Sequence, residues 1–185
     1  MSLNGQQSPV RRLTEGGICI ALSLALSYLK IPVMTGFGGF GGSIDFVMIP
    51  LIIFAVRWGL GWGIGAGFVF GTLKYILASG FAISWVSIIF DYAVAYAFVG
   101  FAGLFKKQYS LLPLAALTGC FARFIIHFIS GITVYAQYMP EEFMGYTGMT
   151  PVLYSVLYNG TYMLPNTIIA IVICTLLIPA AKRIN

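Results

Sequence analysis

The sequence predicts an all-α, polytopic membrane protein, a six-helix bundle with both termini on the cytoplasmic side. Hydrophobic residues make up 59% of the 185 positions and charged residues only 8%, and the mean hydropathy is +0.94. A soluble domain carries about 25% charged residues. The composition therefore indicates that much of the chain lies in a lipid bilayer. At about 20 apolar residues per spanning helix, this length allows six or so spans with short connections.

Six apolar stretches separate the charged residues, and each is expected to form one helix. They cover residues 13–31, 44–56, 59–78, 84–105, 111–137 and 151–180. The second stretch is short and contains Pro50, so we expect it to be tilted, kinked or only partly inserted. Residues 1–10 are predicted to be a polar tail, and residues 11–185 a single six-helix transmembrane domain.

The first stretch could instead be the apolar core of a cleaved signal peptide, with Arg11 and Arg12 as its charged region. No small-x-small cleavage site follows promptly, because the chain continues through Lys30 and Pro32 into a glycine-rich segment. We therefore expect the first helix to remain in the protein.

The distribution of basic residues predicts the orientation. Seven of the ten basic residues fall on one side of a six-span chain, namely Arg11, Arg12, Arg57, Lys106, Lys107, Lys182 and Arg183. Lysine and arginine gather in the cytoplasmic loops of membrane proteins. Both termini are therefore expected in the cytoplasm, and the loop that carries Glu141 and Glu142 is expected outside. This rule also explains the net charge of +5 without a nucleic-acid partner.

Glycine recurs at every fourth residue of the third stretch, from Gly59 to Gly71. Such a bare face lets two helices pack backbone to backbone, and packing within the molecule is the favoured interpretation. The first stretch has a shorter version of this pattern at Gly17 and Ala21. Either face could dock a separate membrane subunit.

Missing motifs narrow the function. The sequence has no Gly-Lys dipeptide and hence no P-loop, and it has neither HExxH nor GxSxG. Its three cysteines lie in separate apolar stretches without metal-ligand spacing, so we predict neither a metal nor a cofactor. An internal repeat, which secondary transporters usually carry, is not apparent. The remaining role is a membrane protein that binds a small solute.

A glycine-rich loop at residues 36–41 matches the dinucleotide fingerprint G-x-G-x-x-G. That fingerprint requires a strand before it and a helix after it, and here it lies between two expected membrane helices, so the match is accidental. With Phe37 and Phe40, the loop could cover an apolar or aromatic ligand, or it could be a passive connector.

Polar residues inside the apolar stretches mark a candidate binding site. Placing the charged side chain of Asp91 in a bilayer costs a free energy of roughly 2.5 kcal/mol or more, which makes this residue a functional-site candidate. His127 and Tyr135 share one helical face of the fifth stretch, and Tyr154 and Asn159 lie near the outer end of the last. A carboxylate among aromatic rings suits a flat, cationic heterocycle, because aromatic faces attract cations.

Other interpretations of these residues remain open. Asp91 could form a structural salt bridge with Arg123 or Lys74, and His127 could be a buried histidine paired with a hydroxyl. Tyr135 could be an interfacial aromatic. An intramembrane enzyme could use Asp91 and His127 as an acid-base pair, although no nucleophile accompanies them. A scaffold protein would explain the glycine faces but not the inward acid.

Several motifs resemble the thiamin-specific substrate-binding subunit, or S-component, of energy-coupling factor (ECF) transporters, from residue 11 onward. The motifs are Leu13-Thr-Glu15, Ile49-Pro50, Arg57-x-Gly-Leu-x-x-Gly63, Asp91-Tyr92, His127-Phe-x-x-Gly-x-x-x-Tyr135 and Tyr154-Ser-x-x-x-Asn-Gly160. The resemblance implies a bacterial plasma-membrane protein that is not an enzyme. It implies that thiamin is captured from outside, and that uptake depends on a membrane-embedded coupling subunit and two ATPase subunits.

The resemblance also implies which residues surround the aminopyrimidine and thiazolium rings of thiamin. They are Asp91, His127, Tyr135, Tyr154, Asn159, Tyr92, Phe81, Asp45 and Phe40. The loop after the first helix would close over the ligand, and the face with Gly17 and Ala21 would dock the coupling subunit.

The sequence departs from the family at three places. Family members carry glutamate where this chain has Asp91, tryptophan where it has Tyr135, and a loop tryptophan where it has Gly41 beside Phe40. A flat cationic ligand still fits these residues. A related pyrimidine or pyridine vitamin is the alternative to thiamin.

Overall fold

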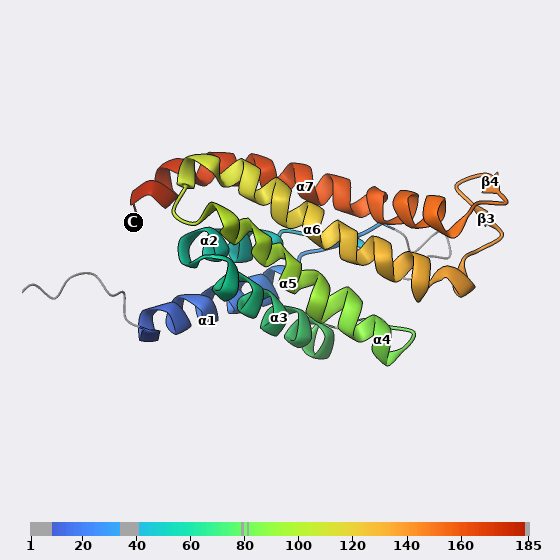
Figure 1. Ribbon diagram of the computed structural model, residues 1–185, viewed down its shortest axis with the longest axis horizontal. Coiled ribbons are helices and arrows are strands. Elements are labelled where there is room, and N and C mark those ends of the chain that lie inside the picture. Colours follow the sequence, from blue (N-terminus) through green and yellow to red (C-terminus); the bar gives the residue numbers. More distant parts are fainter. Residues whose placement is uncertain (1–8, 34–40, 79, 81, 184–185) are drawn as a thin grey trace, which may run out of the picture.

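The structure is a computed structural model that describes residues 9–33, 41–78, 80 and 82–183. Six helical segments form a bundle, with a two-residue strand pair after the first segment and another before the last (Figure 1). The elements are α1 (Pro9–Leu26), β1 (Ile31–Pro32), β2 (Ser43–Ile44), α2 (Met48–Trp58), α3 (Leu60–Leu77), α4 (Trp85–Ile88), η1 (Ile89–Val94), α5 (Ala95–Val99), η2 (Gly100–Phe105), η3 (Tyr109–Leu111), α6 (Leu112–Thr133), η4 (Ala136–Tyr138), β3 (Glu142–Phe143), β4 (Tyr146–Thr147) and α7 (Pro151–Arg183). The predicted all-α class and six-helix arrangement are confirmed.

Four helical segments of the described chain are long and apolar enough to cross a bilayer. They are Leu60–Leu77, Trp85–Phe105, Tyr109–Thr133 and Pro151–Arg183. Several helix ends differ from the prediction: the first helix begins at Pro9 and ends at Leu26, where a turn and β1 follow, α2 runs from Met48 to Trp58, and the fifth helix ends at Thr133. The predicted first and fifth stretches continued into apolar residues that hydropathy alone cannot distinguish from helix.

The short second stretch forms α2, which has 11 residues and lies almost entirely buried in the bundle. At about 1.5 Å per residue it is too short to span a bilayer. Pro50 is the third residue of α2, where its missing N–H has no helical acceptor to lose. The proline therefore belongs to the first turn of the helix and does not interrupt its interior.

The glycines of α3 pack against the segment from α4 to η2. A Cβ at Gly67 would lie 3.0 Å from Ala97 Cα, and one at Gly63 would lie 3.1 Å from Gly100 Cα. On the opposite face, Gly61 and Gly65 have open space. A Cβ at Gly71 would lie 3.2 Å from Ala93 Cα, so this glycine brings the η1 turn against α3. The prediction of packing within the molecule is confirmed for Gly63, Gly67 and Gly71.

The segment from α4 to η2 is one continuous helix with an irregular centre. Ser84 caps its start by accepting a hydrogen bond from the Ser87 backbone N–H, at 3.2 Å. The next turn, η1, has π-helical hydrogen bonding and contains Asp91 and Tyr92. Such π-turns inside α-helices occur frequently at functional sites.

Candidate ligand-binding site

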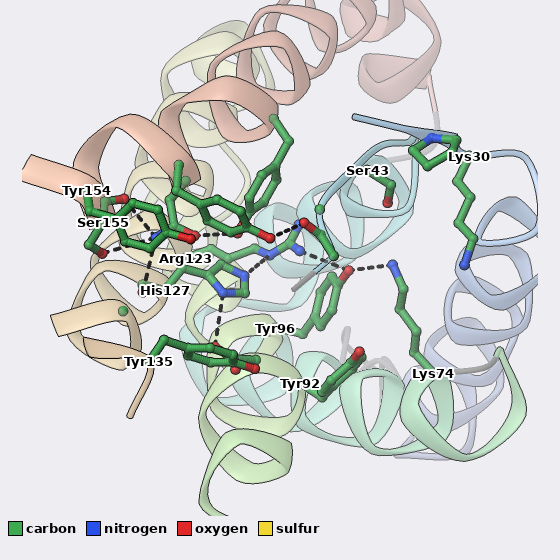
Figure 2. Close-up of a pocket in the computed structure, with 18 residues that line it drawn as sticks. Lys30, Ser43, Lys74, Tyr92, Tyr96, Arg123, His127, Tyr135, Tyr154 and Ser155 are labelled. Atoms are coloured by element: carbon green, nitrogen blue, oxygen red, sulfur yellow. Dashed lines mark hydrogen bonds and ion pairs between the residues drawn. The ribbon is translucent and has the colours of Figure 1, made fainter. Parts of the chain in front are cut away.

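A cavity of about 370 Å³ lies among α3, η1, α5, α6, α7 and the β1–β2 hairpin (Figure 2). This size falls in the usual range for small-molecule sites, about 300 to 1,000 Å³. Its lining residues are Lys30, Pro32, Gly41, Gly42, Ser43, Lys74, Asp91, Tyr92, Tyr96, Arg123, His127, Gly131, Tyr135, Tyr154, Ser155, Tyr158, Asn159 and Tyr162. Because Tyr135 follows α6 and Tyr154 begins α7, the cavity lies toward the β3–β4 end of the bundle.

The structure brings six of the nine predicted ligand contacts to this cavity. They are Asp91, Tyr92, His127, Tyr135, Tyr154 and Asn159. Phe40 and Phe81 lie outside the described residues. Asp45 is only 3% exposed and is not among the lining residues, so its place in the structure is behind the cavity wall.

Asp91 interacts with His127, and His127 in turn with Arg123. Asp91 Oδ1 is 3.3 Å from His127 Nδ1, and Arg123 Nε donates to His127 Nε2 at 3.2 Å. The ion pairs of the described residues thus give Asp91 a histidine partner in place of Arg123 or Lys74. Within the described ranges, the ring partners of His127 are a guanidinium and a carboxylate, and not the hydroxyl of the alternative interpretation.

A second charged cluster joins three lining residues, Lys74, Tyr96 and Arg123, to Asp45 behind the cavity wall. Lys74 Nζ lies 3.1 Å from Asp45 Oδ2 and donates to the Tyr96 hydroxyl at 2.6 Å. Arg123 Nη2 donates to the same hydroxyl at 3.0 Å, and its guanidinium carbon lies 4.1 Å from the Tyr96 ring centre. Buried charges are tolerated when they are paired. Asp45 therefore stabilises the basic side of the cavity.

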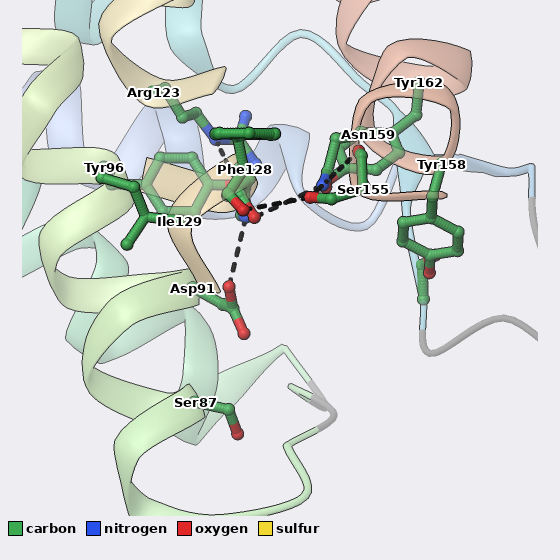
Figure 3. A network of polar contacts seen from close by, with 12 residues as sticks. Ser87, Asp91, Tyr96, Arg123, Phe128, Ile129, Ser155, Tyr158, Asn159 and Tyr162 are labelled. Atoms are coloured by element: carbon green, nitrogen blue, oxygen red, sulfur yellow. Dashed lines mark hydrogen bonds and ion pairs between the residues drawn. The ribbon is translucent and has the colours of Figure 1, made fainter. Parts of the chain in front are cut away.

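Asn159 is fixed by contacts on both sides of its amide (Figure 3). Its Nδ2 donates to Ser155 O at 2.9 Å and to His127 O at 3.3 Å, and its Oδ1 accepts from the Tyr162 hydroxyl at 2.6 Å. Asn159 thus joins α7 to the α6 turn that carries His127. These bonds hold the two helices at a fixed distance around the cavity.

Aromatic rings form the α7 wall. Tyr154 and Tyr158 stack with ring centres 5.6 Å apart, and Phe143 meets Tyr154 edge to face at 5.0 Å. Tyr135 lies beside Ser87 and Asp91 on the other side of the cavity. A flat ring between these walls would meet aromatic faces as well as the carboxylate.

The β1–β2 hairpin is anchored to α7. Asn166 Oδ1 accepts from the Asp45 backbone N–H and Asn166 Nδ2 donates to Ser43 O, both at 2.8 Å, and the Tyr158 hydroxyl donates to Gly41 O. Sequence reasoning missed Asn166. Its spacing of seven residues from Asn159 places both on one helix face, and this was the signal that could have found it.

Three buried polar atoms on the cavity lining have no hydrogen-bond partner within the described part of the chain. They are Asp91 Oδ2, Arg123 Nη1 and the Tyr154 hydroxyl. Buried polar atoms are nearly always hydrogen-bonded in folded proteins. Their combination of one acceptor with two donor-bearing groups is therefore suited to a polar, flat ligand.

Comparisons with known proteins agree over almost the whole chain. The family model described as thiamine transporter protein matches residues 13–185. The chain is 32% identical to the thiamine transporter ThiT of Bacillus subtilis strain 168 over 200 aligned positions, which cover 97% of each protein. It is 30% identical to the thiamine transporter ThiT of Lacticaseibacillus paracasei over 190 positions, with 93% of the chain and 89% of that protein covered.

The fold is also that of a solved structure. ThiT from Listeria monocytogenes superposes with a TM-score of 0.80 at 22% identity, and the match covers 94% of this chain and 96% of that one. At this identity the likeness concerns the fold, which agrees with the helical membrane bundle described above.

Proposed function

We propose that this chain, which belongs to the thiamine transporter family, is the membrane-embedded substrate-binding subunit of an ECF-type importer. In this proposal it captures thiamin from outside the bacterial cell. A separate coupling subunit in the membrane and two ATPase subunits supply the energy for uptake. The family is one of transporters, so the chain is not the intramembrane enzyme that Asp91 and His127 could have suggested.

The observation that carries the proposal is the unpaired, buried Oδ2 of Asp91 at an aromatic cavity. Thiamin joins a cationic thiazolium ring to an aminopyrimidine that has both donors and acceptors. The carboxylate would balance the cation or accept from the amino group, while Arg123 Nη1 and the Tyr154 hydroxyl would donate to ring nitrogens. Tyr135 and Tyr158 would face the rings and supply cation–π attraction.

Two further residues complete the proposed ligand shell. Phe40 would cover the ligand from the loop between β1 and β2, and Phe81 would contact it from the segment before α4. Both are proposals from the family resemblance. Asp45 acts in this proposal through Lys74, since it lies behind the wall.

The orientation follows the charges. α1 begins and α7 ends at the same end of the bundle, opposite the β3–β4 hairpin (Figure 1). Arg11 and Arg12 lie in the first turn of α1, and Lys182 and Arg183 lie in the last turn of α7, so all four basic residues are at this end. By the positive-inside rule this end is proposed to face the cytoplasm, and the cavity the outside.

The α1 face with Gly17 and Ala21 is the proposed docking surface for the coupling subunit. Nothing lies within 4 Å of a Cβ built at Gly17, and Ala21 is exposed. Small residues on an exposed membrane helix allow another helix to approach closely.

Titration calorimetry of protein prepared from thiamin-depleted cells tests the binding function. We expect thiamin to bind more tightly than pyridoxine, a pyridine vitamin, and more tightly than the isolated aminopyrimidine half. Native mass spectrometry should also find a thiamin-sized mass on protein purified without added ligand. Tighter binding of pyridoxine would favour the alternative vitamin class, and binding of none of these compounds would contradict the proposal.

A further inference from the structure

We infer that Arg123, besides the ligand contact proposed for its Nη1, positions His127 through its Nε: it keeps the single histidine of the chain neutral with its proton on Nδ1, and the site thereby selects ligands that donate to Asp91. The chain contains one histidine. His127 and Arg123 are 8% and 6% exposed, and they lie four residues apart on α6. This spacing places them next to each other on one helix face.

Arg123 donates the hydrogen bond that joins it to His127. Arg123 Nε lies 3.2 Å from His127 Nε2. A guanidinium has only donors, so Nε2 must offer its lone pair. A proton on Nε2 would instead place two donors against each other, next to a positive charge.

The other ring nitrogen of His127, Nδ1, carries the proton. A neutral ring with its lone pair on Nε2 carries the proton on Nδ1. Nδ1 lies 3.3 Å from Asp91 Oδ1, so this N–H donates to the carboxylate. The proton stays on the histidine, and Asp91 keeps its negative charge.

Tyr96 holds the guanidinium of Arg123 in place. Its Nη2 donates to the Tyr96 hydroxyl at 3.0 Å, and its guanidinium lies over the Tyr96 ring. Tyr96 is 1% exposed and also accepts from Lys74. The guanidinium therefore has little freedom to turn its Nε away from the histidine.

Both ring nitrogens of His127 are consequently occupied before any ligand arrives. The remaining acceptor of the three residues is Asp91 Oδ2, which is buried and is bonded to neither His127 nor Arg123. Figure 3 shows one carboxylate oxygen joined to the histidine and the other directed away from it. A ligand that places a cation or an N–H next to Oδ2 can interact favourably with the carboxylate. A ligand that places only acceptors there would be repelled.

Without Arg123, Nε2 would be open to a second proton. The resulting imidazolium would form an ion pair with Asp91. This pair would neutralise the carboxylate, and a cationic ligand would be attracted less strongly. The selection of ligands rests on the proposed function, but the state of the histidine does not.

Nuclear magnetic resonance of ¹⁵N-histidine-labelled protein tests this inference, because every histidine signal belongs to His127. In ligand-free wild type at neutral pH we expect Nδ1 protonated and Nε2 unprotonated. Arg123→Met should shift Nε2 to the protonated range, which the loss of a ligand contact alone would not do in ligand-free protein. It should also weaken thiamin binding by about 10- to 100-fold, as for the loss of one charged hydrogen bond. Arg123→Lys, which keeps a donor and the charge, should retain the unprotonated Nε2.

A protonated Nε2 in wild type would overturn the inference, even if Arg123→Met does not fold. An unprotonated Nε2 in a folded Arg123→Met variant would also overturn it, because something else would then set the state. Protein with the expected spectrum that does not bind thiamin would contradict the proposed function alone. Protein that binds thiamin with Nε2 protonated would contradict this inference alone.

Discussion

At the scale of single residues, the charge of Asp91 is the feature with the clearest consequence. Asp91→Asn keeps the shape of the side chain but removes its charge. We expect thiamin affinity to fall by roughly 30-fold or more, about 2 kcal/mol, as when one partner of a buried charge pair is lost. Calorimetry measures this change. Glu142→Gln, which neutralises an exposed acid in the β3–β4 hairpin, should leave the affinity unchanged, and equal losses in both variants would remove Asp91 from its proposed role.

The individual residues also show what spacing can and cannot predict. Asp91, His127 and Asn159 could be placed on the cavity because each is a polar residue in an apolar helix. The position of Asp45 could not, because its contact with Lys74 joins residues 29 positions apart. The direction of the Arg123–His127 bond likewise depends on a side-chain geometry that the sequence leaves open.

At the scale of helices, the glycine face of α3 offers a matched pair of substitutions. Gly67→Ala would place a Cβ against the backbone of Tyr96 and Ala97, whereas Gly65→Ala faces open space. We expect Gly67→Ala to lower the free energy of unfolding by about 1 to 3 kcal/mol through overpacking. Gly65→Ala should be neutral or stabilising, since alanine favours helices over glycine.

Thermal unfolding in detergent, followed by circular dichroism, compares the two variants. Gly67→Ala should also weaken thiamin binding, because α3 supports the helix that carries Asp91 and Tyr92. Equal stability of the two variants would show that the close approach of α3 to α5 is not needed.

The anchor of the β1–β2 hairpin gives a kinetic prediction. Asn166→Ala removes two hydrogen bonds and leaves Ser43 O and the Asp45 N–H unsatisfied, at a cost of about 1 to 3 kcal/mol for each buried group. We expect faster thiamin dissociation, because the hairpin borders the cavity. Stopped-flow fluorescence measures the rate, and Thr175→Val is the control, since that hydroxyl donates to Ile171 O of its own helix. An unchanged rate for Asn166→Ala would show that the hairpin does not limit release.

The helices were the part of the fold that the sequence predicted best. Apolar length and the intervening charges located all six segments, because the bilayer requires long apolar helices. The β1–β2 pair could not be predicted, since Ile31–Pro32 is too short and too apolar to differ from the end of α1. The π-turn at Asp91 also has no periodic signal in the sequence.

At the scale of the whole molecule, binding and energy supply are expected to be separate. The chain has a cavity but no P-loop, so binding should need no ATP. Proteoliposomes that contain this subunit alone should bind thiamin without accumulating it, even with ATP inside. Addition of the coupling and ATPase subunits should produce ATP-dependent accumulation. Sustained uphill uptake by the lone subunit would contradict the proposed division of labour.

The proposed docking surface on α1 offers a way to separate the two proposed activities within one chain. Gly17→Leu adds a branched side chain to an exposed position away from the cavity lining, so thiamin binding by the isolated subunit should be unchanged. Uptake by the complete transporter should fall, because close packing against a bare helix face does not tolerate the added bulk. Co-purification with the coupling subunit and radiolabelled uptake measure the two effects.

Leu176→Trp, at a residue of α7 that is 73% exposed, is the control for bulk on a lipid-facing helix. It should impair neither thiamin binding nor uptake. Normal uptake by Gly17→Leu would place the docking surface elsewhere, whereas a loss of binding together with uptake would show that α1 shapes the cavity itself.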